Sequence, residues 1–301
     1  MEVFIVGASG LVGSNMLRHF SEQGWNVTGS YFSYPSDRLV YYNTLQPDDS
    51  NNWDVHANKP KVIVHCGALT HVDYCEQHPD ESYEKTVQST MNVIKVANQV
   101  GAQMVYLSTD YVFDGVDGPY AEDAEVNPIS VYGRHKLEAE QSVLAMVPNS
   151  LVLRVTNVYG DEARGKNFVS RIVQQCEAGT ALTLKLPYDQ FAHPTNAWDI
   201  AGAAAVLIRD EKRGIYHIGS TDYMNRVELA LRILKRFPAT QYTLDAVSTE
   251  SLAQPAGRPL NGGFIRQKFC SEYPEFTFSN LDDYLGRRNG QKDGDTALID
   301  A

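Results

Sequence analysis

The chain has 301 residues, of which 43% are hydrophobic and 21% are charged. This composition is typical of a globular protein and excludes a disordered, collagen-like or low-complexity chain. The formal net charge of -11 repels phosphate backbones and anionic lipids, so we expect no nucleic-acid partner and no membrane partner. The length exceeds what one hydrophobic core usually spans, which predicts a large domain that carries a smaller lobe.

The N-terminus and the cysteines favour a cytoplasmic protein. Glu2 stands where a secretory signal needs a basic residue, and Gly7 ends the first apolar run early. No segment approaches the roughly 18 consecutive apolar residues of a membrane helix. Asp73 and Glu76 suit a solvated helix start better than a metal site, so we expect no metal. No C-x-x-C pair occurs, and reduced thiols are expected at Cys66, Cys75, Cys176 and Cys270.

Short apolar runs alternate with helical patterns in the first half of the chain. The predicted strands are residues 3–6, 25–32, 39–42, 62–66, 104–107 and 151–155, and the predicted helices are residues 11–20, 83–100 and 130–145. Parallel strands need a crossover connection, and short apolar strands suit a sheet that is covered on both faces. The pattern therefore predicts an α/β fold with a doubly wound, Rossmann-type parallel sheet.

The alternation becomes irregular after residue 160. Shorter elements are predicted there, namely strands at residues 179–184 and 214–218 and helices at residues 198–208 and 227–237. We assign residues 1–160, with parts of 190–220, to the Rossmann domain and residues 161–285 to a discontinuous smaller α/β lobe near the C-terminus. Residues 286–301 are polar and have no period, which predicts a loose tail.

A glycine-rich turn, GASGLVG at residues 7–13, follows the first strand directly and opens the first helix. Glycines permit a tight turn and let backbone N–H groups and the positive helix end approach a pyrophosphate. A turn that serves only helix–strand packing is the alternative. The context favours a dinucleotide site with contacts from Gly7, Ser9, Gly10, Leu11 and Val12.

The end of the second strand bears on the choice of cofactor. An acidic residue there would bind a ribose 2'-hydroxyl and repel a 2'-phosphate, but residues 29–33 contain none. The hydroxyls of Ser30, Tyr31 and Ser33, together with Arg38, suit a 2'-phosphate. This favours NADP, with NAD as the alternative. An ordinary surface charge is an equal reading of Arg38.

Tyr132 and Lys136 lie four positions apart on the predicted helix after Ser130 and so share one face. A lysine cation beside a phenol favours the phenolate, so we expect a lowered tyrosine pKa and a proton donor for a nascent alkoxide. The spacing alone is common by chance. Thr109, at the end of the fifth strand, adds a hydroxyl at the same sheet edge and strengthens the case.

These residues resemble the extended short-chain dehydrogenase/reductase superfamily and, within it, the dTDP-4-dehydrorhamnose reductase family. The resemblance covers roughly residues 1–285. Besides the glycine turn, the matching segments are ALTHVD (68–73), STDYVF (108–113), YGRHK (132–136), NFV (167–169), DQFAHPT (189–195) and RP (258–259).

The resemblance implies a reductase of carbohydrate biosynthesis that delivers hydride from NADPH to a nucleotide-linked 4-keto sugar. The implied catalytic residues are Thr109, Tyr132 and Lys136. Further cofactor contacts are implied at Asn43, Cys66, Gly67, Ala68 and Ser108. The smaller lobe is implied to bind the nucleotide sugar, with contacts from Asp110, Asn157, Phe168, Gln190 and Arg258. A guanidinium such as that of Arg258 suits a diphosphate.

Two alternatives stay open. The regulatory subunit of methionine adenosyltransferase resembles the same reductases, so the chain is alternatively a non-catalytic partner. An epimerase or dehydratase with tightly held NAD is the other alternative, although such relatives usually keep an acid after the second strand. The chain also departs from the family at Thr86, where an asparagine is common. The sugar, the nucleotide and the oligomeric state are left open, a homodimer included.

Overall fold

A seven-stranded parallel sheet forms the centre of the molecule in the computed structural model, which describes residues 1–162 and 164–291. The strand order is β3-β2-β1-β4-β5-β6-β9. The strands are β1 (Glu2–Val6), β2 (Asn26–Tyr31), β3 (Val40–Tyr41), β4 (Val62–His65), β5 (Gln103–Thr109), β6 (Leu151–Val155) and β9 (Gly214–His217). The prediction of a doubly wound parallel α/β sheet is confirmed.

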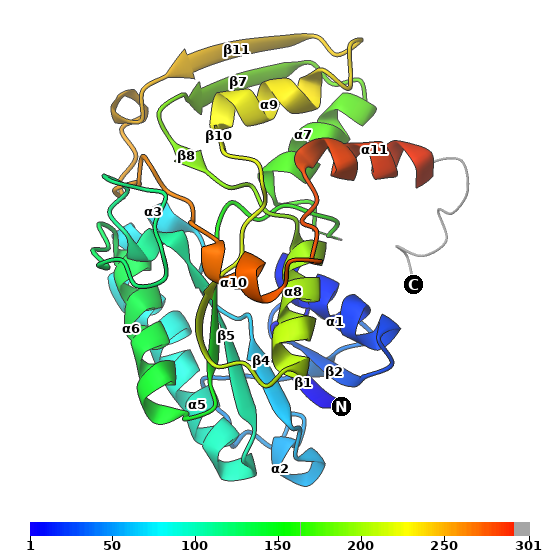
Figure 1. Cartoon of the computed structure of the whole chain (residues 1–301), viewed down its shortest axis with the longest axis vertical. Coiled ribbons are helices and arrows are strands. Elements are labelled where there is room, and N and C mark those ends of the chain that lie inside the picture. The colour runs from blue at the N-terminus through cyan, green and yellow to red at the C-terminus, as the bar shows by residue number, and fades with distance from the viewer. Residues whose placement is uncertain (163, 292–301) are drawn as a thin grey trace.

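Helices cover both faces of this sheet (Figure 1). Helices α1 (Leu11–Glu22) and α8 (Ala197–Arg209) pack on one face, and α2 (Val55–Asn58), α5 (Ser89–Val100) and α6 (Val131–Met146) pack on the other. Successive side chains of a strand point to opposite faces. Val3 and Ile5 of β1 accordingly join the first core, whereas Phe4 and Val6 join the second.

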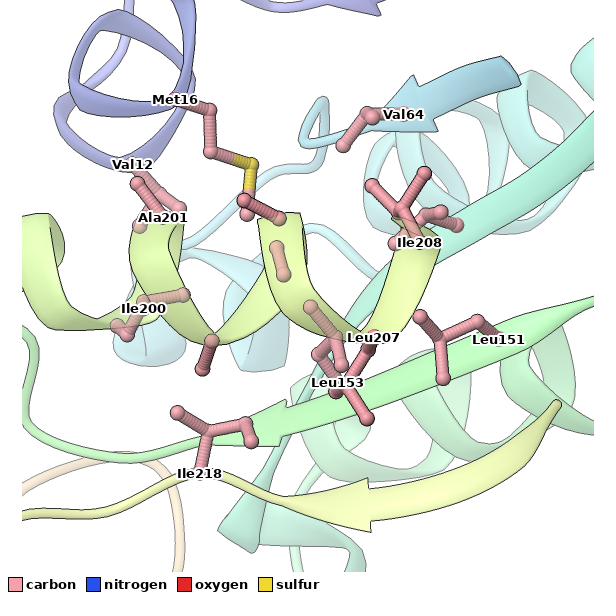
Figure 2. Packing of buried hydrophobic residues seen from close by; sticks show 14 of the residues in the cluster. Val12, Met16, Val64, Leu151, Leu153, Ile200, Ala201, Leu207, Ile208 and Ile218 are labelled. Atoms are coloured by element: carbon pink, nitrogen blue, oxygen red, sulfur yellow. The ribbon is translucent and has the colours of Figure 1, made fainter. Parts of the chain in front are cut away.

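Helix α8 is buried on most sides, which explains its run of small and apolar residues. Figure 2 shows it between α1, which contributes Val12 and Met16, and β6, which contributes Leu151 and Leu153. Ala201 faces α1, where a small side chain lets the two helices approach closely. Among the described residues, no helix has the length and apolarity that crossing a bilayer requires.

A smaller lobe lies beyond the carboxyl ends of the central strands (Figure 1). It contains α7 (Phe168–Glu177), α9 (Arg226–Leu234), α11 (Leu281–Gln291) and a parallel pair of strands, β7 (Leu182–Pro187) and β11 (Tyr242–Val247). Its core is separate and includes Ile172, Leu229 and Leu285. The antiparallel pair β8 (Phe191–Ala192) and β10 (Met224–Asn225) leads toward the sheet, and the remaining helices are α3 (Val72–Gln77), α4 (Pro79–Tyr83) and α10 (Gln267–Glu272).

The structure corrects three local predictions. Residues 286–291 are not a loose tail, because α11 continues to Gln291 after burying Leu281, Tyr284 and Leu285 in the lobe; residues 292–301 lie outside the described residues. The strand predicted from residue 179 begins at Leu182 instead, since Gly179 has a positive φ of 67°. The helix predicted over 83–100 is interrupted by a π-helical segment, Glu84–Gln88, that contains Thr86.

Candidate active site

The site lies where parallel strands end along one edge of the sheet. Strands β1, β2, β4, β5 and β6 all run in the same direction, so the segments that follow them meet at that edge. The glycine turn follows β1, residues 66–68 follow β4, and Thr109 ends β5. The sheet topology thus assembles residues that are up to a hundred positions apart in the sequence.

Close backbone packing shapes the glycine turn. Gly7 has a positive φ of 83°, and a Cβ on it would lie 3.1 Å from the amide nitrogen of Gly67 after β4. A Cβ on Gly13 would lie 2.5 Å from the carbonyl oxygen of Gly7. The Gly7 N–H also donates to Ser30 Oγ of β2 at 3.3 Å. The turn is therefore held against both neighbouring strands and requires its glycines.

The N-terminus of α1 fits an anion. Its N-cap residue, Gly10, makes no side-chain capping bond, and the first turn contains no acidic residue. The first N–H groups of a helix lack intrahelical partners and carry partial positive charge. Gly10 and the partly buried Ser9 and Leu11 thus form a cradle whose chemistry suits the pyrophosphate of a dinucleotide, with Val12 buried beneath it.

The residues predicted to recognise the cofactor ribose follow β2 and β3. Tyr31 is partly buried and packs edge-on against Tyr41, whereas Ser33 and Arg38 are exposed. Asn43 Oδ1 accepts the Leu45 N–H at 3.0 Å in a local turn, and the cofactor contact of Asn43 stays a prediction. The side-chain oxygen of Asn43 is therefore already engaged by its own loop.

Residues 66–68 face the glycine turn across the sheet edge. Burial raises the pKa of the Cys66 thiol to about 12, and its Sγ lies 4.0 Å from Met16 Sδ. Cys66 is consequently a neutral packing group and not a nucleophile. A Cβ on Gly67 would lie 3.2 Å from the His65 ring. The Gly67 and Ala68 segment therefore offers mainly backbone to a ligand.

The predicted catalytic residues come from β5 and α6. Ser130 caps α6 by accepting the Gly133 N–H at 3.1 Å, which places Tyr132 in the first turn and Lys136 one turn later. Lys136 Nζ donates to the Leu107 carbonyl oxygen and lies 4.1 Å from the centre of the Tyr106 ring. Both contacts tie the lysine to β5.

The charge states of these groups differ from the sequence-based expectation. The Tyr132 pKa is raised and not lowered, because burial of the phenol outweighs the opposing hydrogen bond from Thr109. Asp110 raises it further, and Lys136 is not among its main influences. Burial lowers the Lys136 pKa to about 7. Tyr132 is therefore a protonated phenol beside the Thr109 hydroxyl, which suits a proton donor.

Asp110 lies directly behind the tyrosine and threonine. Its Oδ2 accepts the Thr156 hydroxyl at 2.5 Å, and its Oδ1 accepts the Thr109 hydroxyl at 3.3 Å. Burial raises the Asp110 pKa, while these hydrogen bonds oppose the rise. The carboxyl group thereby orients Thr109 and joins the ends of β5 and β6.

Asn157 and Phe168 both contact Arg226, a residue that the sequence did not identify as part of the site. Asn157 has a positive φ of 41°, and its Oδ1 accepts from Arg226 at 2.6 Å. The same guanidinium lies 5.1 Å from the centre of the Phe168 ring. Burial lowers the Arg226 pKa, Tyr111 and Asp110 oppose that effect, and Arg171 and Arg258 lower the pKa further, so a cluster of three arginines lies beside a carboxyl and a phenol group. An arginine at a helix start has no distinctive sequence signal.

The other predicted substrate residues already have protein partners. Arg258 pairs with Asp73 at 2.9 Å, which corrects the reading of Asp73 as a solvated helix residue. Glu76 is likewise engaged, since it accepts the Val131 N–H at 2.8 Å. Gln190 donates to Thr249 Oγ1 at 2.9 Å across the small lobe. Among the described residues, no group of side chains is arranged to hold a metal.

Residues 1–275 match the sequence model of the family described as RmlD substrate binding domain. The chain belongs to the RmlD family. The match spans both the sheet and most of the small lobe, so this RmlD-family member shares more than a nucleotide-binding motif with its relatives. The recognised resemblance to short-chain reductases of this kind is confirmed.

The similar proteins include a methionine adenosyltransferase subunit as well as reductases. This RmlD-family chain is 32% identical to methionine adenosyltransferase 2 subunit beta of Bos taurus, over 86% of this chain and 78% of that protein. It is 29% identical to a probable low-salt glycan biosynthesis reductase, Agl14, of Haloferax volcanii, over 100% and 98%. A Bacillus anthracis dTDP-4-dehydrorhamnose reductase solved with NADP shares 26% identity and superposes with a TM-score of 0.81 over 95% of this chain and 98% of that one.

Proposed function

We propose that the protein is an NAD(P)H-dependent reductase of a nucleotide-linked 4-keto sugar in carbohydrate biosynthesis. The observation that carries the proposal is the contact of Tyr132 with Thr109 at the end of β5, where Lys136 of the same helix binds the Leu107 carbonyl oxygen. A proton donor and a lysine at this end of the sheet would suit a dinucleotide held by the glycine turn after β1. The similarity to reductases in the RmlD family supports the same activity.

The cofactor site is proposed to hold NADP, with NAD as the alternative. When bound, the reduced nicotinamide supplies a hydride to a carbonyl carbon. Gly7, Ser9 and Gly10 would hold the pyrophosphate at the start of α1, and Lys136 would hold the nicotinamide ribose. The exposed Ser33 and Arg38 suit a 2'-phosphate, and residues 29–33 contain no acidic residue that would repel it.

The chain's own residues then stabilise the developing alkoxide. Thr109 and Tyr132 hydrogen-bond the substrate oxygen, and Tyr132 transfers its proton to that oxygen as negative charge develops. Asp110 keeps the Thr109 hydroxyl oriented through the bonds that it accepts from Thr109 and Thr156.

The nucleotide sugar is proposed to bind between the sheet edge and the small lobe. Arg226 and Arg171 place positive charge around Asn157 and Phe168 in a protein whose net charge is -11, and Arg258, which pairs with Asp73, lies nearby. Guanidinium groups match diphosphate oxygens geometrically. A flat aromatic ring such as Phe168 suits the nucleotide base or the sugar face.

The direct test supplies purified protein with NADPH or NADH and dTDP-4-dehydrorhamnose, and follows the absorbance of the reduced nicotinamide. We expect oxidation of the cofactor that depends on the keto sugar. A panel of other nucleotide-linked keto sugars tests whether the substrate carries a different base or sugar. If no member of the panel accelerates oxidation of either cofactor, the reductase proposal fails. Oxidised NAD retained through purification would instead favour an epimerase or dehydratase.

A regulatory subunit is the second candidate, favoured by the 32% identity to methionine adenosyltransferase 2 subunit beta. Such a role needs binding but no turnover. Mixing the protein with a methionine adenosyltransferase catalytic subunit and measuring their mass by light scattering tests it. A stable complex without keto-sugar reduction would favour the regulatory role, whereas reduction without a complex would favour the enzyme. The same measurement on the protein alone tests for a homodimer.

A further inference from the structure

Glu140 is a buried carboxylate on α6, one helical turn after Lys136, and it joins two strands. Its Oε2 accepts the Ser108 hydroxyl at 2.6 Å and the Arg154 Nε–H at 3.1 Å, while its Oε1 accepts from the other end of the Arg154 guanidinium at 2.5 Å. The side chains of Glu140 and Arg154 are only 1% and 3% exposed. The contact is therefore a buried ion pair in which both carboxylate oxygens of Glu140 accept hydrogen bonds.

The location of these bonds matters for the catalytic residues. Ser108 immediately precedes Thr109, and Leu107 accepts the hydrogen bond of Lys136. Glu140 and Lys136 thus attach one face of α6 to consecutive residues at the end of β5. A loss of the Glu140 contacts would release the strand at the point where Thr109 must face Tyr132.

The other titratable groups around Lys136 are neutral. Burial lowers the His65 pKa to about 3, so the imidazole on β4 carries no charge near neutral pH. Burial also raises the Cys66 pKa to about 12 and the pKa of the Tyr106 phenol on β5 well above its usual range. Tyr132, on the same helix as the lysine, is likewise protonated. Burial lowers the Lys136 pKa, and of the two groups that raise it, Glu140 and Cys66, Glu140 has the larger effect.

Two further titratable groups, Arg154 and His217, lie behind the Glu140 carboxylate. Arg154 lies on β6 beyond the carboxylate, and His217 of β9 contacts it at 3.3 Å. The burial of His217 and the nearby Arg154 charge lower the His217 pKa to about 3. The Arg154 guanidinium therefore lies between the Glu140 carboxylate and the His217 ring.

We propose that Glu140 is a positioning residue that keeps Lys136 in its ammonium form and holds the end of β5 in register with α6. The proposal rests on the proposed function in that Lys136 acts on the bound cofactor. It assigns the Glu140 and Arg154 pair a role in setting the pH range of the site, in addition to its contribution to the core.

The test compares Glu140→Gln with wild type and with Glu140→Asp, and measures the NADPH dissociation constant by nicotinamide fluorescence across neutral pH. Dividing the dissociation constant of each variant by that of wild type at the same pH cancels the effect of titrating the cofactor itself. An opposite charge nearby shifts a pKa by about one unit or more. We therefore expect Glu140→Gln to bind several-fold more weakly at neutral pH and nearly normally about two pH units lower. Glu140→Asp should restore most of the affinity.

Glu138→Gln is the matched control, because Glu138 lies on the same helix and its side chain is exposed. It should leave the pH dependence unchanged. If the ratio of the Glu140→Gln and wild-type dissociation constants is above one but the same at every pH, the role of Glu140 is purely structural and the proposal is overturned. A ratio of one at every pH also overturns it.

An unpaired Arg154 could prevent folding of the single variant, so thermal unfolding is measured in parallel. The double variant Glu140→Gln with Arg154→Gln removes both buried charges and should retain the pH-dependent loss; a pH-independent ratio in the double variant overturns the proposal. The assay uses no keto sugar. Absence of sugar reduction together with the expected shift would therefore refute the proposed reaction and leave the role of Glu140 intact.

Discussion

Tyr132 and Thr109 show how burial and hydrogen bonding set the chemistry of single residues. Burial keeps the Tyr132 phenol protonated, and the adjacent Thr109 hydroxyl opposes that effect. A protonated phenol is the form that a carbonyl reduction requires from its acid. The lysine four positions later contributes its charge to a different part of the site, where it contacts the Leu107 carbonyl.

Replacing Tyr132 with phenylalanine should remove the proton donor and preserve the ring. We expect keto-sugar reduction to fall by about 10²–10⁴-fold, the range typical of a lost general acid. Cofactor affinity should change little because the glycine turn is untouched. Steady-state kinetics and NADPH titration of the same preparation measure both effects. Reduction at the wild-type rate would exclude Tyr132 as the proton donor.

Replacing Arg226 with methionine should weaken binding of the nucleotide sugar. Hydrogen bonds to charged groups contribute about 1.5–3 kcal/mol, which predicts a rise in KM of about ten-fold or more with a smaller change in kcat. Arg213→Met is the control, since Arg213 is exposed and immediately precedes β9, at the amino end of a central strand and not at the carboxyl edge. An unchanged KM in the Arg226 variant would show that the three-arginine cluster lies outside the substrate site.

The unit of β1, the glycine turn and α1 is the element to which we assign cofactor binding. Its helix has no capping side chain, so backbone N–H groups are left for a ligand. Its close approach to the sheet also needs small residues on both sides. Gly29 of β2 shows this, because a Cβ there would lie 2.6 Å from Ala8 Cβ.

Gly13→Ala should therefore damage both packing and binding. The added Cβ would lie 2.5 Å from the Gly7 carbonyl oxygen, which is backbone and has little freedom to move. Overpacking of this kind costs about 1–3 kcal/mol of unfolding free energy. Urea unfolding and NADPH titration should both report losses. The control is Gly286→Ala in α11, where nothing lies within 4 Å of the added Cβ. Full NADPH affinity in the Gly13 variant would show that the turn tolerates expansion.

At the scale of the whole molecule, the chain crosses between the sheet and the lobe several times. Helix α8 and strand β9 belong to the sheet, although the lobe elements α7 and β7 precede them and α9 and β11 follow them. The last described helix, α11, packs into the lobe core. The division into a Rossmann domain and a discontinuous lobe stays a prediction about folding units.

Leu285→Ala tests the contribution of α11 to the whole molecule. Leu285 is 2% exposed in the lobe core, and removing a buried leucine side chain typically costs about 2–5 kcal/mol of unfolding free energy. Leu231→Ala is the matched control, because Leu231 on α9 is 43% exposed and should change stability by less than about 0.5 kcal/mol. Urea unfolding measures both. Equal stability of the two variants would contradict the burial of α11.

The sequence by itself determined the parallel α/β sheet and the edge at which the candidate site lies. Apolar runs of strand length and helical patterns are local signals, and the turn at residues 7–13 carries its chemistry in its own glycines. The cap at Ser130 likewise places Tyr132 and Lys136 on one helix face without reference to distant residues.

Only the tertiary structure decided which charges meet. Arg226 reaches Asn157, Arg258 pairs with Asp73, and Glu140 pairs with Arg154 across elements that the sequence separates. Tertiary structure also decided that residues 286–291 continue a helix, because the preceding turn is buried in the lobe. Burial and pairing depend on the neighbours that folding brings together. Burial raised the Tyr132 pKa where the sequence predicted a lowered one, because desolvation is a property of the packed molecule and not of a local motif.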